Sequence, residues 1–198
     1  MNIRFANLTD CHQIARLHKT CLTESFLGLL GIGILNILYK ALAKYPGGIL
    51  FVAQEGDETI GFVSGVDNVK RFYKFFLKKF WFNASFLLFL KVFSPKTLKK
   101  IFETMNYGAN EKIEGLPEAE LLSIAVIEKF RGQGASKMLF DELKQEFNNR
   151  NISKFKIIVG CCLIGAQKFY EKMGCVKVAE TEIHKGASSK ILLCEVGG

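Results

Sequence analysis

The chain has 198 residues, 49% of them hydrophobic and 23% charged, which excludes a disordered protein and suits a single domain with a sizeable core. The formal net charge is +8, a value compatible with nucleic acid, an anionic membrane or a polyanionic cofactor. Basic totals are common in soluble enzymes, so we expect no nucleic-acid partner.

Six cysteines stand at positions 11, 21, 161, 162, 175 and 194. No two of them have the C-x-x-C spacing, and no signal peptide precedes them. His18 and Cys21 have a ligand-like spacing, but no second pair completes a metal site. The pattern predicts a reduced, cytoplasmic protein with buried thiols and without a metal site.

The first part of the chain predicts a strand, two helices and a hairpin. Alternating apolar residues indicate a strand over residues 2–7, and Thr9 or Asp10 suits the N-cap of the helix that follows. Residues 26–42 are very apolar, but polar residues and glycines interrupt them, which favours a buried helix over a membrane span. Two strands follow, over residues 48–54 and 59–66.

Residues 67–117 are the least typical part, and we interpret them as a helical insertion. Residues 69–93 mix basic with aromatic side chains, and Ser94 with Pro95 predicts the start of a helix that runs to about Met105. One interpretation is a helical cap whose aromatic rings cover the sheet and whose lysines face water. The other is a surface for RNA or a membrane.

A strand, a loop of small residues and a helix follow the insertion. Residues 121–127 are apolar and predict a buried strand. The loop reads Arg131-Gly132-Gln133-Gly134-Ala135-Ser136, and the helix carries its apolar residues at Met138, Leu139, Leu143 and Phe147. Small residues let the backbone approach a ligand, and a helix N-terminus attracts negative charge. The segment therefore predicts an anion cradle, a name we use for residues 131–136.

The last part of the chain predicts a strand over residues 154–159 and then a helix. In the helix, Ala166, Tyr170 and Gly174 follow one another at intervals of four. Apolar neighbours share the face that holds Tyr170, so its side chain should point inward. Closing strands are expected over 176–184 and 190–196, joined by residues 185–189.

Together these segments resemble motifs A and B of the GNAT superfamily of acyl-CoA N-acyltransferases. The first motif, Arg/Gln-x-x-Gly-x-Gly/Ala, matches at Arg131 and Gly134 and departs at Ser136. The second, Asn-x-x-Ala-x-x-x-Tyr-x-x-x-Gly-Phe, departs at Leu163 and Cys175. The resemblance covers nearly the whole chain apart from the insertion.

The resemblance implies an α/β (α+β) fold in one domain, residues 1–198. A mixed, mostly antiparallel central sheet of about seven strands would be flanked by helices. The insertion, residues 67–117, would lie between the third and fourth strands.

The resemblance also implies an acetyl-CoA-dependent N-acetyltransferase that moves an acetyl group to a primary amine by direct transfer in a ternary complex, without a metal. Amides at the helix start would hold the pyrophosphate of coenzyme A, and the fourth strand would align the pantetheine arm. The cofactor-binding residues so implied are Ile124, Ala125, Val126, Arg131, Gly132, Gln133, Gly134, Ala135 and Ser136.

Two residues stand where the family places catalytic groups. Glu120 would be the general base, and Tyr170 the general acid that protonates the leaving thiolate. The structural alternatives are a solvated glutamate at a strand start and a tyrosine that only packs in the core.

Other questions stay open at the level of the sequence. The acceptor is a small-molecule or peptide amine whose identity the motifs do not give, and a longer acyl chain is an alternative to acetyl. A homodimer and a membrane-surface contact through residues 69–93 also remain open. A different class of function is a catalytically degenerate module that binds RNA or an anionic membrane through the basic aromatic insertion.

Overall fold

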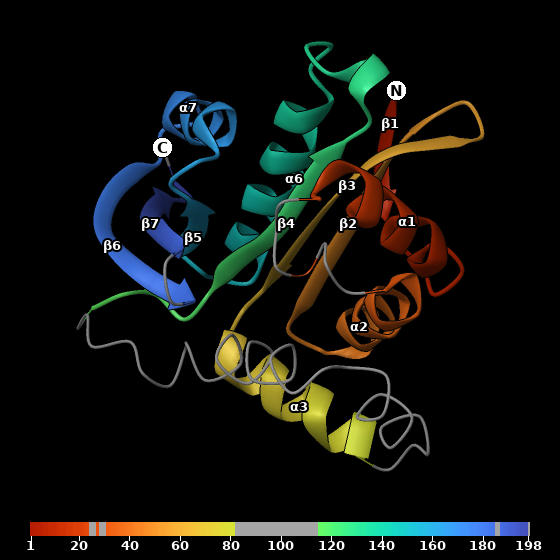
Figure 1. Ribbon diagram of the computed structural model, residues 1–198, viewed down its shortest axis with the longest axis horizontal. Coiled ribbons are helices and arrows are strands. Elements are labelled where there is room, and N and C mark those ends of the chain that lie inside the picture. The colour runs from red at the N-terminus through yellow and green to blue at the C-terminus, as the bar shows by residue number, and fades with distance from the viewer. Residues whose placement is uncertain (24–26, 28–30, 82–114, 185–186, 198) are drawn as a thin grey trace. The chain divides into compact units, whose positions relative to one another are not determined.

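The computed structural model describes residues 1–23, 27, 31–81, 115–184 and 187–197 (Figure 1). The chain has a mixed α/β fold with a seven-stranded, mostly antiparallel sheet flanked by helices, which confirms the predicted fold class. It divides into two compact units, each described here by itself. The first holds residues 1–67 and 121–153, and the second holds residues 68–120 and 154–196. The assignment of all residues to one domain stays a prediction.

Four strands of the first unit lie in the order β1-β2-β3-β4. They are β1 (Asn2–Phe5), β2 (Gly48–Glu55), β3 (Glu58–Val66) and β4 (Glu120–Val126), whose first residue belongs to the second unit. Strand β2 pairs antiparallel with both β1 and β3. The turn between β2 and β3 contains Gly56 at a φ of 57°, a left-handed conformation that glycine adopts without strain. The predicted strands and hairpin are therefore present.

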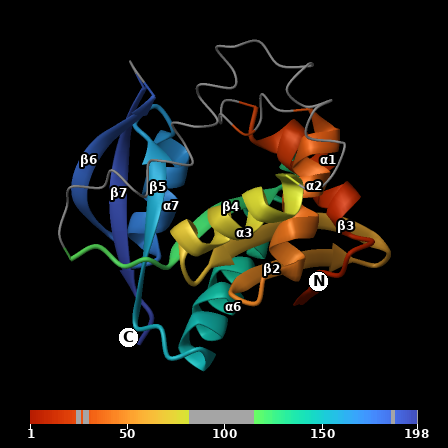
Figure 2. The ribbon, with the colours of Figure 1, turned by 90° about the horizontal axis from the view of Figure 1, so that it is seen from below.

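Three helices cover the two faces of this part of the sheet. They are α1 (Cys11–Cys21), α2 (Ile32–Lys44) and α6 (Ala135–Asn149). A Cβ atom on Gly61 of β3 would lie 3.3 Å from Leu139 of α6, whereas the next residue, Phe62, packs against Tyr39 of α2. Because successive residues of a strand face opposite sides, α6 covers one face of β3 and α2 covers the other. Figure 2 shows these strands between α6 and the α1–α2 pair.

The buried stripe of α6 differs in one position from the predicted one. Ala135, Leu139, Leu143 and Phe147 follow one another at intervals of four and are all buried. Met138 is 40% exposed, because it lies one position away from this stripe. The last two residues of the anion cradle, Ala135 and Ser136, are the first two of the helix, so packing of the buried stripe fixes their position.

Helix α1 begins as predicted after Asp10, although this residue does not cap it in the expected way. The Asp10 carboxylate accepts hydrogen bonds from both terminal nitrogens of Arg4, at 2.7 and 2.9 Å, and from the Asn7 amide. The Arg4 guanidinium holds the pKa of Asp10 below its usual range. The carboxylate thus ties β1 to the start of the helix.

Helix α2 begins at Ile32, later than the apolar run of residues 26–42 suggests. Residues 26 and 28–30 lie outside the part of the chain that the structure describes. Leu35, Tyr39 and Leu42 of this helix are buried, as a core helix requires. Among the described residues, no helix has the length and apolar character needed to cross a membrane.

The second unit contains three antiparallel strands in the order β5-β7-β6, which lie side by side in both views (Figure 2). They are β5 (Lys154–Gly160), β6 (Val176–His184) and β7 (Ala187–Glu195), and helix α7 (Ile164–Lys172) joins β5 to β6. The connection between β6 and β7 has two residues, 185–186, where the sequence suggested five. Strand β7 begins earlier because Ser188 and Ser189 pair with Glu182 and Thr181.

The insertion begins with a helix, α3 (Val69–Trp81), as predicted. Asn68 caps this helix, because its side-chain oxygen accepts a hydrogen bond from the Arg71 amide at 2.9 Å. Residues 82–114, including the helix predicted from Ser94 to about Met105, lie outside the described residues.

A chain of buried polar groups crosses the core of the first unit. His18 of α1 is fully buried, and its Nδ1 atom lies 2.6 Å from the Tyr39 hydroxyl of α2. Tyr39 is hydrogen-bonded to Ser123 and Ser64, and the Ser64 hydroxyl donates to the Ser123 carbonyl at 3.2 Å. These bonds join α1, α2, β3 and β4. His18 had no assigned role in the analysis of the sequence.

We predict that His18 makes the protein less stable in mild acid. Burial lowers the pKa of His18 to about 4, whereas an unfolded histidine has a pKa near 6.5. Below about pH 6.5 the unfolded state therefore binds a proton that the folded state does not. Stability should fall by up to about 3 kcal/mol as the pH falls from about 6.5 to 4.

Urea unfolding at several pH values measures this effect in the parent protein and in two variants. His18→Asn retains an acceptor for Tyr39 but does not titrate, so its stability should change less between pH 6.5 and 4. His12→Asn alters an exposed histidine of the same helix and should keep the parent's dependence. Equal pH dependence in the parent and His18→Asn would contradict the prediction.

Candidate active site

The anion cradle in the first unit is a loop with two left-handed glycines. Strand β4 ends at Val126, a 3₁₀ turn (Glu128–Phe130) follows, and α6 begins at Ala135. Gly132 has a φ of 77° and Gly134 a φ of 90°. A Cβ atom at either position would meet no atom within 4 Å. The backbone conformation, and not lack of space, therefore favours glycine here.

Backbone amides point out of the start of α6. The Met138 amide makes the first hydrogen bond along the helix, to the Gly134 carbonyl at 3.0 Å. The amides of Ala135, Ser136 and Lys137 precede it and have no acceptor within the helix. The positive end of the helix dipole lies at the same place, so the cradle can bind a phosphate group.

Two side chains of the loop brace it from within. Arg131 donates from Nε to the Val126 carbonyl at 3.1 Å, and Gln133 donates from its side-chain nitrogen to the Lys129 carbonyl at 2.9 Å. The resemblance assigned Arg131 to cofactor binding. In the structure it also closes the loop onto the end of β4 and leaves its terminal nitrogens for an anion.

The strand that leads into the cradle is held from both faces. Ala125 and Val126 are buried, and Ile124 is partly exposed. A Cβ atom on Gly61 would lie 2.8 Å from the Ala125 carbonyl, so only glycine allows β3 to approach β4 this closely. On the other face, Ser64 holds the Ser123 carbonyl. The residues assigned to the cofactor thus lie at the end of β4 and, after the 3₁₀ turn, in the loop and the start of α6.

Glu120 lies in the second unit and is buried rather than solvated. It is 8% exposed, and its carboxylate lies 4.0 Å from the ammonium of Lys156, a β5 residue that is 2% exposed. Tyr73 of α3 is a further neighbour: burial and then the Glu120 charge raise the pKa of its phenol. The solvated alternative for Glu120 does not describe the structure. Neither Lys156 nor Tyr73 could be recognised from the sequence as a neighbour of Glu120, because the residues around them along the chain do not predict contact with a buried carboxylate.

Tyr170 of α7 is also buried in the second unit. The residue is 6% exposed, and burial raises the pKa of its phenol. A tyrosine in this environment keeps its proton at neutral pH, as a proton donor must. Its backbone carbonyl accepts a hydrogen bond from the Cys175 amide at 3.0 Å, which closes the end of the helix.

A buried glutamine that the sequence did not single out fixes the start of α7. Gln167 donates to the carbonyls of Gly160 and Cys161, at 2.9 and 3.0 Å, and accepts a hydrogen bond from Lys190 at 2.7 Å. These bonds join the end of β5, helix α7 and strand β7. They fix the first turn of the helix whose next turn carries Tyr170.

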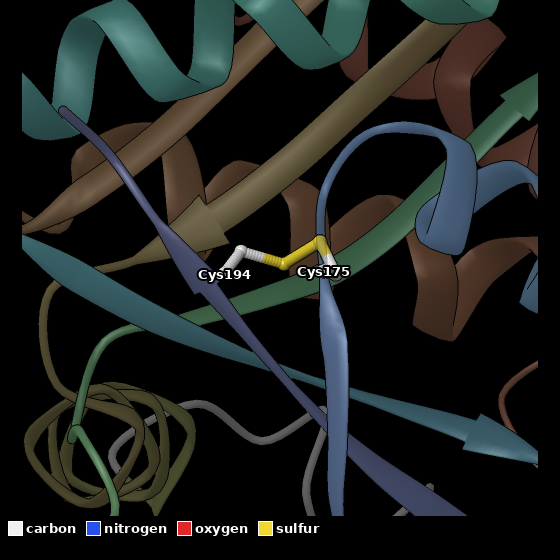
Figure 3. Close-up of a disulfide and its surroundings, with 2 residues drawn as sticks. All are labelled: Cys175 and Cys194. Atoms are coloured by element: carbon white, nitrogen blue, oxygen red, sulfur yellow. A yellow bond between two sulfur atoms is a disulfide. The ribbon is translucent and has the colours of Figure 1, made fainter. Parts of the chain in front are cut away.

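Cys175 and Cys194 form a disulfide, whereas the sequence predicted reduced thiols (Figure 3). Val176 pairs with Leu193 across β6 and β7, so the two cysteines face each other at a Cα–Cα distance of 4.4 Å. Both are buried. The other cysteines, Cys11, Cys21, Cys161 and Cys162, are not in disulfides.

The comparisons with known proteins establish the family. The model of the acetyltransferase (GNAT) family matches residues 13–175. The chain belongs to the GNAT family. No curated protein sequence matches it significantly.

Solved structures with the same fold cover nearly the whole GNAT chain at low sequence identity. The structure of SsHAT covers 100% of this chain and 98% of its own, with a TM-score of 0.72 and 13% identity. An N-acetyltransferase from Staphylococcus aureus Mu50 has a TM-score of 0.63 and 16% identity, with coverage of 98% and 100%. YncA from Salmonella typhimurium, a putative acetyltransferase solved with its cofactor acetyl-CoA, has a TM-score of 0.62 and 12% identity, with coverage of 100% and 95%.

We predict that the disulfide stabilises the GNAT chain. It closes a loop with a sequence separation of 19 residues, and restricting an unfolded chain in this way stabilises the fold by about 3 kcal/mol. Cys194→Ser should therefore lower the free energy of unfolding by about this amount under oxidising conditions. Urea unfolding with and without a reductant measures the effect.

The control is Cys162→Ser, which removes an exposed cysteine outside the disulfide. This variant should match the parent, and the reductant should destabilise both. Equal stability of the parent with and without reductant, with the disulfide shown by mass spectrometry to form and to be reduced, would contradict the prediction.

Proposed function

We propose that the protein transfers an acetyl group from acetyl-CoA to a primary amine by direct transfer in a ternary complex. The observation that carries this proposal is the anion cradle, with its two left-handed glycines and the open amides of α6. Membership of the GNAT family supports acetyl-CoA as the donor. The acceptor, a small molecule or a peptide, stays unspecified, and the cytoplasmic location and the homodimer stay predictions.

In this proposal the cofactor is held by groups of the first unit. The amides from Gln133 to Ser136 bind the pyrophosphate, and Arg131 contributes a charge. The backbone of Ile124, Ala125 and Val126 aligns the pantetheine arm, and an amide of this strand polarises the thioester carbonyl. The hydrogen bonds to the Val126 and Ser123 carbonyls support the proposal, because a strand that aligns the cofactor must keep its position.

Glu120 and Tyr170 move the protons. Glu120 accepts a proton from the ammonium form of the acceptor, since only the neutral amine has a lone pair for attack. The amine nitrogen then bonds to the carbonyl carbon, and the carbon–sulfur bond breaks. Tyr170 protonates the departing thiolate. Lys156 favours the ionised form of Glu120 that can accept a proton, and the buried phenol of Tyr170 retains the proton it must donate.

We predict that acetyl-CoA stabilises the parent protein and fails to stabilise Gly134→Glu. A ligand at a hundredfold excess over its dissociation constant adds roughly 2.7 kcal/mol to the native state. A Cβ atom at this position would meet no atom within 4 Å, and a carboxylate beside the cradle would repel a pyrophosphate. Thermal unfolding with and without acetyl-CoA measures the difference.

Gly56→Glu is the matched control, because Gly56 also has a positive φ and open space around its Cβ position. Both variants should lose stability through left-handed strain, by about 1–2 kcal/mol. Only Gly134→Glu should lose the response to acetyl-CoA. A parent protein that acetyl-CoA does not stabilise would contradict the proposed function and favour a catalytically degenerate module.

We also predict that Tyr170→Phe and Glu120→Gln each slow turnover about a hundredfold, the usual contribution of a general acid or base. Affinity for acetyl-CoA should change little, because neither side chain belongs to the cradle. A panel of amines with chromatographic detection of coenzyme A measures turnover. Thiol reagents are unsuitable, because Cys162 is exposed. Parent-like turnover in both variants would overturn their assignment as acid and base.

A further inference from the structure

Helix α3 carries a row of positive charges that the proposed acetyl transfer does not use. Its 13 residues, Val69–Trp81, include one arginine and four lysines and no acidic residue. Lys70, Arg71, Lys74 and Lys78 are all exposed. We call these four residues the basic stripe.

Helical geometry places the stripe on one face. Lys70, Lys74 and Lys78 follow one another at intervals of four, so they form a line about 12 Å long with Arg71 beside it. The opposite face holds Val69 and Phe72, which are 4% and 1% exposed. The helix is therefore fixed to the protein by its apolar face and presents the basic face to solvent.

The residues of the basic stripe lack the ion pairs that several other lysines form. Lys129, Lys137, Lys154 and Lys177 each form an ion pair with a carboxylate. Within the part of the chain that the structure describes, none of the four stripe residues forms an ion pair. No carboxylate of the described residues pairs with them, so their positive field can attract an external anionic surface.

Partly buried apolar side chains lie on both edges of the stripe. Phe75 and Leu77 are half-buried, and helical spacing places them on either side of the four cations. Lys79 lies over the Phe75 ring, 4.9 Å from its centre. The helix has no Asn or Gln, the side chains that pair with adenine, and Phe72 is too buried to stack with a base.

We propose that the basic stripe binds the surface of an anionic phospholipid membrane. Lysine and arginine reach lipid phosphates while their stems and the flanking apolar groups lie against the headgroup region. A straight row of cations on a fixed helix matches a flat anionic surface, and each cation near such a surface contributes to binding. This association is peripheral and does not depend on acetyl-CoA binding, so it can be tested separately from the proposed function.

Co-sedimentation of the 198-residue protein with vesicles tests the proposal. Vesicles of phosphatidylcholine alone and of phosphatidylcholine with 30% phosphatidylglycerol are compared at 50 mM and 500 mM NaCl. We expect binding only to the anionic vesicles, with a strong loss at high salt. The triple variant Lys70→Glu, Lys74→Glu, Lys78→Glu should bind at least about 100-fold more weakly.

The matched control is Lys168→Glu, Lys172→Glu, Lys177→Glu, which changes three exposed lysines outside α3. It changes the net charge by the same amount, so retention of vesicle binding would show that the stripe, and not the total charge, is responsible. Circular dichroism and thermal unfolding confirm that both triple variants fold.

Three results would overturn the proposal. They are equal binding to neutral and anionic vesicles, equal loss in both triple variants, and no vesicle binding by the parent. Fluorescence anisotropy with a single-stranded RNA completes the test. Stripe-dependent binding to the RNA without binding to vesicles would assign the stripe to nucleic acid and overturn the membrane proposal.

Discussion

The buried hydrogen bonds from His18 through Tyr39 to Ser64 and Ser123 join two helices and two strands of the first unit. An unpaired polar group in an apolar core costs about 1–3 kcal/mol, so these groups specify one arrangement of two helices and two strands. Apolar packing alone tolerates small shifts between elements. The bond to the Ser123 carbonyl extends this specification to β4, the strand that leads into the anion cradle.

A second constraint is the backbone of the cradle itself. Gly132 and Gly134 turn the chain so that α6 begins with its amides exposed, while Ala135 and Leu139 fix the helix against the sheet. These features were predictable, because they depend on local sequence: glycine spacing, an apolar strand before it and a helical stripe after it. Most element boundaries could be predicted from the same kind of pattern and the fold class from the family resemblance, whereas the cofactor residues stay a prediction.

The features that could not be predicted depend on strand register or on burial of charged groups. Cys175 and Cys194 meet only because Val176 pairs with Leu193, and no pattern within either strand encodes that register. Lys156 lies in the core beside Glu120, where hydropathy would place an apolar residue. Buried polar groups such as Gln167 and His18 have no signature, since the partners that justify their burial come from distant segments.

Two means of attracting an anion occur in this chain, and they imply different partners. The cradle uses fixed backbone amides at a helix start, which suit a single phosphate group in a defined orientation. The basic stripe uses long, exposed side chains without ion-pair partners in the described structure, which suit many phosphates without a defined orientation. Salt should weaken anion binding by the basic stripe more than binding by the cradle, because the charges of the stripe are exposed to solvent. The two proposals are therefore compatible, because a phosphate in the cradle and an anionic surface on the basic stripe would bind through different groups.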